Sequence, residues 1–299
     1  MPEYVEVPAP DGRTIEALVG EGEGAALVFH HGTPSAAVPF RLLERAAGRF
    51  GFRVVTPSRA GYGRSTARPP SERGPRVIDD AVDALCVLDH LGVHEFSTLG
   101  WSGGGPRALA LAALAPQRCW SVTVLAGPAP YAAEDLDWYA GMVDDNVQEL
   151  EAAARGAEAY DEFLQALPFP EEEHERTDEE IVARFGDALC PSDAAFLTRS
   201  FARYLDETGR RSRMQGMVGW RDDGLALVAE WGLDEATVTT PVGIWHGAAD
   251  RMVPPAHSGW LADRLPTADL HVIEGEGHFS LLRCLDEVVD ELARRYQPD

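Results

Sequence analysis

The chain contains no lysine, because all 26 of its basic residues are arginine. A lysine amine forms Schiff bases with carbonyl substrates, anchors pyridoxal phosphate, and grips phosphate in the P-loop motif. The sequence therefore excludes the enzyme classes that depend on one of these lysines.

Positive charge is scarce overall. The 26 basic residues stand against 49 acidic ones, which gives a formal net charge of -23. Surfaces that bind nucleic acid or anionic lipid need a positive potential. We therefore expect neither nucleic acid nor a membrane as a partner, and we expect a small-molecule substrate. The oligomeric state is left open between monomer and homodimer.

Cysteine is rare, and apolar runs of membrane-spanning length are missing. Cys86, Cys119, Cys190 and Cys284 lie far apart without C-x-x-C spacing, which predicts free thiols and excludes a zinc knuckle or a dithiol redox motif. The N-terminus lacks the basic and apolar regions of a signal peptide. We therefore expect a cytoplasmic protein.

What the sequence does contain is an alternation of short apolar runs with longer helical patterns. This alternation is typical of βαβ units that build a mostly parallel sheet. Runs at 4–7 and 14–19 flank a turn and predict a hairpin at the antiparallel edge. Further strands are predicted at 25–29, 53–56, 96–99, 121–125, 241–246 and 270–273, and helices at 40–50, 77–91, 106–115, 257–265 and 281–296. The predicted fold class is α/β, with a mostly parallel eight-stranded sheet flanked by helices.

One long segment interrupts this alternation. From 128 to 238 the strand patterns vanish and the sequence is helical and strongly acidic, with acidic runs at 171–173 and 178–180 that we expect to be solvated. We interpret 128–238 as an inserted helical cap. Residues 1–127 and 239–299 are assigned to the core domain.

The strongest local motif is Gly100-Trp101-Ser102-Gly103-Gly104, between a predicted strand and a predicted helix. A serine nucleophile at this place needs a sharp, strained turn, and a Cβ on the flanking positions would collide with the neighbouring strand and helix. Gly100 and Gly104 meet that steric requirement. Ser102 is therefore the predicted nucleophile.

Two residues further along the chain complete a catalytic triad. Asp250 follows the strand predicted at 241–246, and His278 follows the last predicted strand. In open α/β sheets, functional groups collect beyond the carboxyl ends of the strands. An imidazole takes the proton of the serine, and a carboxylate fixes the imidazole's tautomer. Ser102, Asp250 and His278 also follow the chain order expected for this arrangement.

The oxyanion hole is predicted from backbone groups. It takes one N–H from the residue after the nucleophile and one from the loop after an earlier strand. Gly103 meets the first condition, and Thr33, in His31-Gly32-Thr33-Pro34, meets the second.

Taken together, these motifs resemble the α/β-hydrolase superfamily over nearly the whole chain. The resemblance implies an α/β-hydrolase fold with a serine nucleophile and a helical cap. Because 128–238 matches only in position and helical character, it does not identify the substrate. The motifs that carry the resemblance are His31-Gly32-Thr33-Pro34, Gly61-Tyr62-Gly63-Arg64-Ser65, Gly100-Trp101-Ser102-Gly103-Gly104, Asp250 and His278.

The motifs of this chain differ from those of several α/β-hydrolase subgroups, and these differences narrow the range of expected functions. Epoxide hydrolases and haloalkane dehalogenases place an aspartate where this chain has Ser102, so alkyl-enzyme chemistry is not expected. The His-Gly-Gly-Pro-Gly and Gly-Gly-Ser-Trp-Gly motifs of proline iminopeptidases are not reproduced, and that aminopeptidase activity is kept as an alternative. Ser58 stands where many relatives have Asp, which leaves open what this position contacts.

The predicted function is hydrolysis of a small-molecule carboxylic ester through an acyl-enzyme, without a metal or an organic cofactor. Thioester, lactone or amide bonds are less favoured. A C–C bond hydrolase and a cofactor-free haloperoxidase use similar triads and stay open as alternatives. A small-molecule receptor that binds without turnover is the alternative of a different class.

The remaining histidines do not predict a metal site. His30 and His31 are neighbours on a strand and point to opposite faces, so they cannot share an ion, and we expect structural or oxyanion-loop roles. His246, His257 and His271 have no motif around them, and no role is predicted for them.

Overall fold

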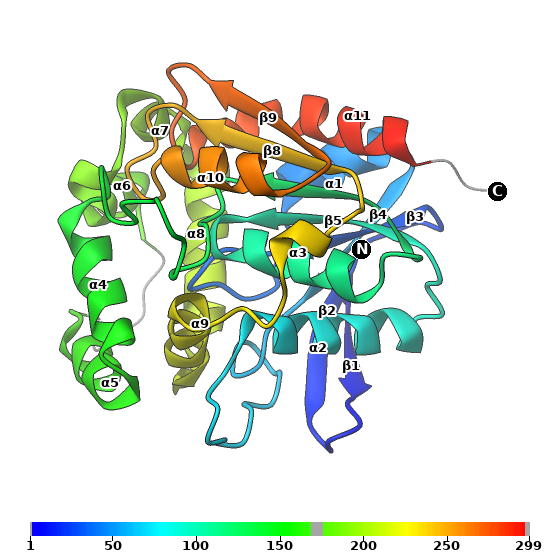
Figure 1. The fold of residues 1–299 in the computed structure, drawn as a ribbon, viewed down its shortest axis with the longest axis horizontal. Helices are drawn as coiled ribbons and strands as arrows, with labels where there is room; N and C mark the ends of the chain where they lie inside the picture. Colours follow the sequence, from blue (N-terminus) through cyan, green and yellow to red (C-terminus); the bar gives the residue numbers. More distant parts are fainter. Residues whose placement is uncertain (1, 169–175, 297–299) are drawn as a thin grey trace.

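An eight-stranded sheet forms the centre of the computed structural model, which describes residues 2–168 and 176–296 (Figure 1). The strand order is β1-β2-β4-β3-β5-β6-β8-β9. β2 pairs antiparallel with β1 and β4, whereas the other pairings are parallel. The strands are β1 (Glu3–Pro8), β2 (Thr14–Val19), β3 (Ala25–His30), β4 (Phe52–Pro57), β5 (Phe96–Trp101), β6 (Cys119–Leu125), β8 (Val242–Gly247) and β9 (Ala268–Ile273). The predicted sheet and its antiparallel edge are confirmed.

Helices cover both faces of the sheet because its central strands are apolar on both faces. In β3, Ala26 and Val28 belong to the core cluster under α2 (Val77–His90), α3 (Gly105–Leu114) and α10 (Ala256–Arg264). Leu27 and Phe29 belong to the cluster under α1 (Arg41–Arg49) and α11 (Leu285–Arg295). Successive side chains of a strand point to opposite faces, so a continuous apolar run needs cover on each side.

The flanking helices agree with the sequence prediction except at the C-terminal end. There, the helix predicted at 281–296 is a 3-10 turn over Ser280–Cys284 followed by α11.

The chain between β6 and β8, residues 126–241, is mostly helical, and we call it the helical segment. In Figure 1 its helices gather on the side toward which β8 and β9 point. Tyr160, Leu164 and Trp220 form a core of their own there, together with Tyr62 from the loop after β4. The helices of the segment are α4 (Asp144–Ala154), α5 (Ala157–Ala166), α6 (Asp178–Phe185), α7 (Pro191–Phe196), α8 (Arg199–Ser212) and α9 (Val218–Val228).

One prediction for this segment is wrong, because it contains a short strand, β7 (Met214–Met217). Gly216 has a φ of 74°, and the four residues show no apolar alternation, so the sequence carries no strand pattern there. The acidic run at 171–173 lies outside the described residues. Glu179 and Glu180 of the second run are exposed, as predicted.

All four cysteines are free thiols, as predicted, with Cys119 and Cys190 buried and Cys86 and Cys284 half-buried. Within the described ranges, no helix combines the length and the apolar character needed to cross a bilayer.

Candidate active site

Ser102 lies at the turn where β5 leads into α3. Its φ of 56° falls in the left-handed region, which residues other than glycine rarely adopt. A Cβ on Gly100 would overlap the carbonyl oxygen of Gly104, and a Cβ on Gly104 would overlap that of His30. The steric requirement predicted for this turn is therefore confirmed. The turn places Ser102 directly after the carboxyl end of β5.

The loops after β8 and β9 bring Asp250 and His278 together. Nδ1 of His278 donates to Oδ2 of Asp250 over 2.7 Å, and both side chains are buried. Oδ1 of Asp250 accepts the N–H groups of Met252 at 2.8 Å and Val253 at 3.0 Å. Since β8 and β9 are neighbouring parallel strands, their loops leave the sheet at the same edge.

The protonation states of this pair follow from its surroundings. Burial alone would lower the pKa of His278, but the Asp250 carboxylate outweighs it and raises that pKa above its ordinary value. Burial would raise the pKa of Asp250, but His278 and the hydrogen bonds from His246 and His278 lower it. Because the ionised carboxylate accepts the Nδ1 proton, Nε2 of His278 is left able to accept another.

Trp101 joins the serine turn to the histidine loop. Its ring lies 5.6 Å from the His278 ring between centroids, and its Nε1–H donates to the His278 carbonyl over 3.3 Å. Because Trp101 directly precedes Ser102, these contacts bring the predicted nucleophile and the predicted base to the same edge of the sheet.

The two predicted oxyanion donors also lie against each other. A Cβ on Gly103 would overlap Oγ1 of Thr33 and would lie 3.5 Å from the Thr33 backbone nitrogen. A Cβ on Gly32 would lie 3.4 Å from the Cβ of Ser102. The structure thus gathers the predicted site residues at one place, with Thr33 and Gly103 beside Ser102.

His246, for which no role was predicted, lies behind the Asp250 carboxylate. Its Nε2 lies 2.7 Å from the Val253 carbonyl and 3.4 Å from Oδ2 of Asp250, and its Nδ1 lies 2.5 Å from Oγ of Ser258. A carbonyl can only accept, so Nε2 carries a proton. His246 therefore supports the Asp250 carboxylate. No sequence motif indicated this role.

Asp193, on α7, holds the loop that carries His278. Its Oδ1 accepts the N–H groups of Phe279 at 2.9 Å and Ser280 at 2.8 Å, and its Oδ2 accepts that of His278 at 3.2 Å. Gly277 lets the carboxylate come this close, because a Cβ there would overlap Oδ2. The sequence analysis missed this residue, which is one acid among many in an acidic segment.

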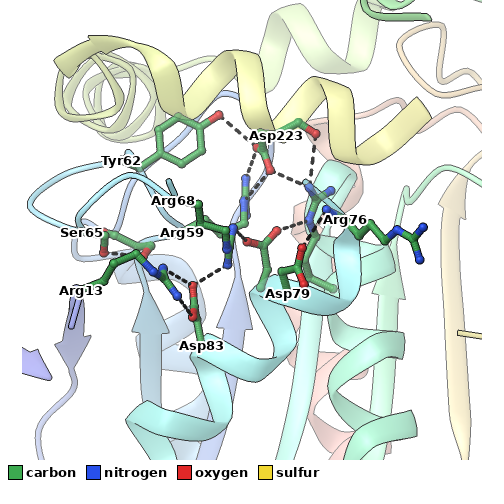
Figure 2. A network of polar contacts seen from close by, with 12 residues as sticks. Arg13, Arg59, Tyr62, Ser65, Arg68, Arg76, Asp79, Asp83 and Asp223 are labelled. Atoms are coloured by element: carbon green, nitrogen blue, oxygen red, sulfur yellow. Dashed lines mark hydrogen bonds and ion pairs between the residues drawn. The ribbon is translucent and has the colours of Figure 1, made fainter. Parts of the chain in front are cut away.

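A second buried carboxylate, Asp223 on α9, lies behind the Thr33 loop. Arg59 and Arg107 pair with it at 2.6 and 2.7 Å, and their side chains are 4% and 0% exposed. In Figure 2 Asp223 reaches from its helix toward Arg59 and Tyr62. Sequence reasoning missed this network as well, although Arg59 and Tyr62 belong to a loop it had singled out.

Three more positions singled out in the sequence, Ser58, His30 and His31, are buried. Ser58 donates to Oε1 of Glu16 over 2.9 Å and accepts the Ala37 N–H over 3.1 Å, which identifies the contacts of this position. His30 and His31 are buried, and burial lowers the pKa of His30 to about 3 and that of His31 well below its ordinary value. Both rings are therefore neutral.

His257, also without a predicted role, connects α10 to the helical segment. Its Nδ1 accepts the Ala129 N–H over 3.1 Å, and its Nε2 donates to the Trp138 carbonyl over 3.0 Å. Burial lowers its pKa to about 4, so the ring is neutral at pH 7.

Potential metal ligands gather away from this site, on β9 and α11. The ligand atoms of Asp269, His271 and Glu291 lie within 4.8 Å of one another. Arg295 pairs with Glu291 at 2.6 Å, and the Trp245 Nε1–H donates to the same carboxylate over 2.8 Å. These contacts account for the cluster as an ion-pair group at the edge of the sheet.

Comparisons with known proteins agree with this geometry. The family model described as alpha/beta hydrolase fold matches residues 25–283. Rhodomycin D methylesterase DauP of Streptomyces sp. (strain C5) is 30% identical over 286 residues, which cover 88% of this chain and 87% of the relative. A pimeloyl-acyl-carrier-protein methyl ester esterase of Aromatoleum aromaticum is 28% identical over 253 residues, which cover 78% and 82%.

Among solved structures, bromoperoxidase from Bacillus anthracis superposes with a TM-score of 0.73 at 20% identity, over 98% of this chain and 100% of the other. A likeness at this identity supports the fold alone. The family model spans most of the chain, and the curated relatives include methylesterases. The chain therefore belongs to the alpha/beta hydrolase fold family and is a hydrolase with esterase homologues.

Proposed function

We propose that this hydrolase is a serine esterase in which Ser102 is the nucleophile, His278 the general base and Asp250 the residue that orients the base. The observation that carries the proposal is the 2.7 Å hydrogen bond between His278 Nδ1 and Asp250 Oδ2, in a loop that contacts the serine turn. The bond leaves Nε2 of His278 as the proton acceptor, which is the protonation state that a general base requires.

The mechanism follows from these roles. His278 takes the proton of Ser102 as its oxygen attacks the ester carbonyl, and the N–H groups of Thr33 and Gly103 stabilise the oxyanion. The C–O bond to the alcohol then breaks, and the alcohol takes the proton from His278. A water molecule repeats the sequence on the acyl-enzyme and releases the carboxylic acid.

We infer that the substrate is the methyl ester of a small carboxylic acid, so that the products are the acid and methanol. The support is that the two curated relatives are named for methyl ester cleavage. The acyl group has to be recognised by the helical segment, since α/β-hydrolase chemistry at the sheet edge is shared across many substrates.

We also propose that residues 128–238 act as a cap over the site, with 1–127 and 239–299 as the core domain. Two observations support this division. The segment has an apolar core around Tyr160 and Trp220, and its helices α7 and α9 direct buried carboxylates at the loops of the site.

The test combines active-site labelling with turnover. Wild type should react with a fluorophosphonate probe and release methanol from a panel of methyl esters, while Ser102→Ala and His278→Ala should do neither. Ser71→Ala, at an exposed serine, is the matched control and should behave as wild type. A folded wild type that is neither labelled nor active on any ester would overturn the proposal.

The same experiment separates the alternatives. A receptor would bind ligand without multiple turnover. An aminopeptidase would prefer amino-acid amides, a C–C bond hydrolase would cleave a vinylogous diketone, and a haloperoxidase would need peroxide together with a carboxylate and halide. Methanol release that is faster than each of these reactions supports the esterase.

A further inference from the structure

Asp223 is a buried carboxylate that receives hydrogen bonds from several sides. Its Oδ1 accepts from Nε of Arg59 at 2.8 Å and from a terminal nitrogen of Arg107 at 2.7 Å. Its Oδ2 accepts from Arg59 at 2.6 Å, from the Thr33 hydroxyl at 2.6 Å and from the Tyr62 hydroxyl at 3.0 Å. The donors come from three core loops or helices, whereas Asp223 comes from the helical segment.

Arg59 connects Asp223 to the Thr33 loop, because it also binds two backbone carbonyls of that loop. One terminal nitrogen donates to the His31 carbonyl over 2.7 Å, and the other donates to the Gly32 carbonyl over 2.8 Å. The Gly32 carbonyl and the Thr33 N–H belong to the same planar peptide group. Binding at the carbonyl therefore fixes the direction of the N–H and polarises it as a donor.

Arg107 binds Gly103 on the other side of the site, at the carbonyl of the peptide group that follows the Gly103 N–H. One terminal nitrogen donates to the Gly103 carbonyl over 2.8 Å, while Nε donates to Asp80 over 3.0 Å. Among the described residues, Asp223 is the carboxylate that both arginines bind. The distance between the Thr33 loop and Gly103 depends on that shared partner.

The two buried carboxylates that bind Arg107, Asp223 and Asp80, are stabilised in their ionised form. Burial alone would raise the pKa of Asp223, but Arg107 and Arg59 outweigh it and lower that pKa. Asp80 behaves in the same way, since Arg68 and Arg107 offset its burial and lower its pKa. Side chains of alternating charge therefore connect Asp223 to Arg13 and Asp83 at the other end of the network (Figure 2).

We propose that Asp223 is a positioning residue for the oxyanion hole, which directs the Thr33 N–H through Arg59 and holds Gly103 in place through Arg107. The inference rests on the proposed function. It assigns to the helical segment a part in the chemical step, in addition to any part in substrate recognition. Neither arginine touches the ester, and each acts through a backbone group.

A role of this kind has a kinetic signature. The oxyanion forms only as the reaction proceeds, so misplaced donors raise the barrier without weakening the binding of the neutral ester. The expected result is a fall in kcat with KM nearly unchanged. A merely structural role would lower the number of active sites or the stability, and would leave kcat per active site as it was.

The test is Asp223→Asn, with kcat expressed per site titrated by a fluorophosphonate. The substitution keeps the shape but replaces one accepting oxygen by an NH2 group that cannot bind an arginine. We expect kcat per site to fall about 10- to 100-fold, because small misplacements of reacting groups have effects of this size. KM should change less than about threefold.

Asp222→Asn is the matched control. Asp222 is the neighbouring residue on α9, pairs with Arg221 at 2.8 Å, and is half-buried. Its kcat per site should stay within about twofold of wild type. An Asp223→Asn enzyme that matches this control would overturn the inference while leaving the esterase intact.

If Asp223→Asn does not fold, Arg59→Lys tests the same inference. Lysine keeps the charge, but a single ammonium cannot hold Asp223 and the two carbonyls in the geometry of the planar fork. The same selective fall in kcat supports the inference, and unchanged kcat per site overturns it. A wild type without ester turnover would overturn the proposed function, and this inference with it.

Discussion

The two sides of the candidate site are held by the helical segment in different ways. On the histidine side, Asp193 binds the N–H groups of residues 278–280 directly. On the oxyanion side, Asp223 reaches the loop carbonyls only through Arg59 and Arg107. Both carboxylates are buried, and both come from the same segment.

The difference follows from which backbone groups have to stay available. The N–H groups of the histidine loop have no chemical task, so a carboxylate can accept them. The N–H groups of Thr33 and Gly103 are the proposed oxyanion donors and must face the substrate, which leaves only carbonyl oxygens for binding to the scaffold. A carboxylate cannot bind a carbonyl, and arginine supplies the donors in between.

The largest effect is expected on the histidine side, from Asp250→Asn. The amide NH2 would donate to the ring and favour the wrong tautomer of His278, and the charge that stabilises the imidazolium would be lost. We expect kcat to fall about 10⁴-fold. Initial rates with a methyl ester check this, with Asp263→Asn on the exposed surface of α10 as control. A loss smaller than tenfold would contradict the assigned role.

On the oxyanion side, the largest expected effect is on stability, from Arg107→Met. The change removes the charge between Asp80 and Asp223 and leaves two buried carboxylates with less compensation. We expect a loss of about 3–5 kcal/mol in the free energy of unfolding. Urea denaturation measures it. Arg294→Met, which breaks an exposed pair with Asp290, should cost at most about 0.5 kcal/mol.

Asp193→Asn should shift the pH dependence of the reaction. The negative charge of Asp193 helps to raise the pKa of His278, although burial opposes it and Asp250 contributes more. The base must be neutral, so kcat/KM falls as the pH drops through the pKa of His278 in the free enzyme. Removing the charge lowers that pKa, and the acidic limb should move to lower pH. A limb that moves upward or stays in place would contradict the electrostatic part of this account.

The smallest effect is expected from Ser58→Ala, close to the oxyanion side but outside the arginine network. The substitution leaves the buried Ala37 N–H without its acceptor and removes one donor from Glu16, which keeps its pairing with Arg211 at 2.6 Å. We expect a loss of about 1–2 kcal/mol in stability. The kcat per titrated site should stay unchanged, and a fall in kcat would extend the positioning network to Ser58.

The sheet and the serine turn could be predicted because their requirements are local. A strand that is buried on both faces is mostly apolar, and the turn around Ser102 demands glycine at positions 100 and 104 because backbone atoms fill the space of a Cβ. Asp250 and His278 were predicted for a similar reason, since each follows a recognisable strand. Only the structure shows that their side chains lie side by side.

The residues that support the candidate site could not be predicted, because no local sequence pattern distinguishes them from other residues of the same type. Asp193 and Asp223 are two of 49 acidic residues, and most acids in such a segment are solvated. Arg59 meets Asp223 across 164 positions of sequence. His246 likewise has no motif, and its role depends on the loop that folds back to present the Val253 carbonyl.

The sequence by itself determined the fold class, the serine turn and the order of the candidate triad, because these depend on the size and polarity of residues close together in the chain. Only the tertiary structure decided which carboxylates are buried and what they hold. Whether an aspartate is solvated or ionised in the interior depends on arginines and backbone groups that come from other parts of the chain, and their position is a property of the whole fold.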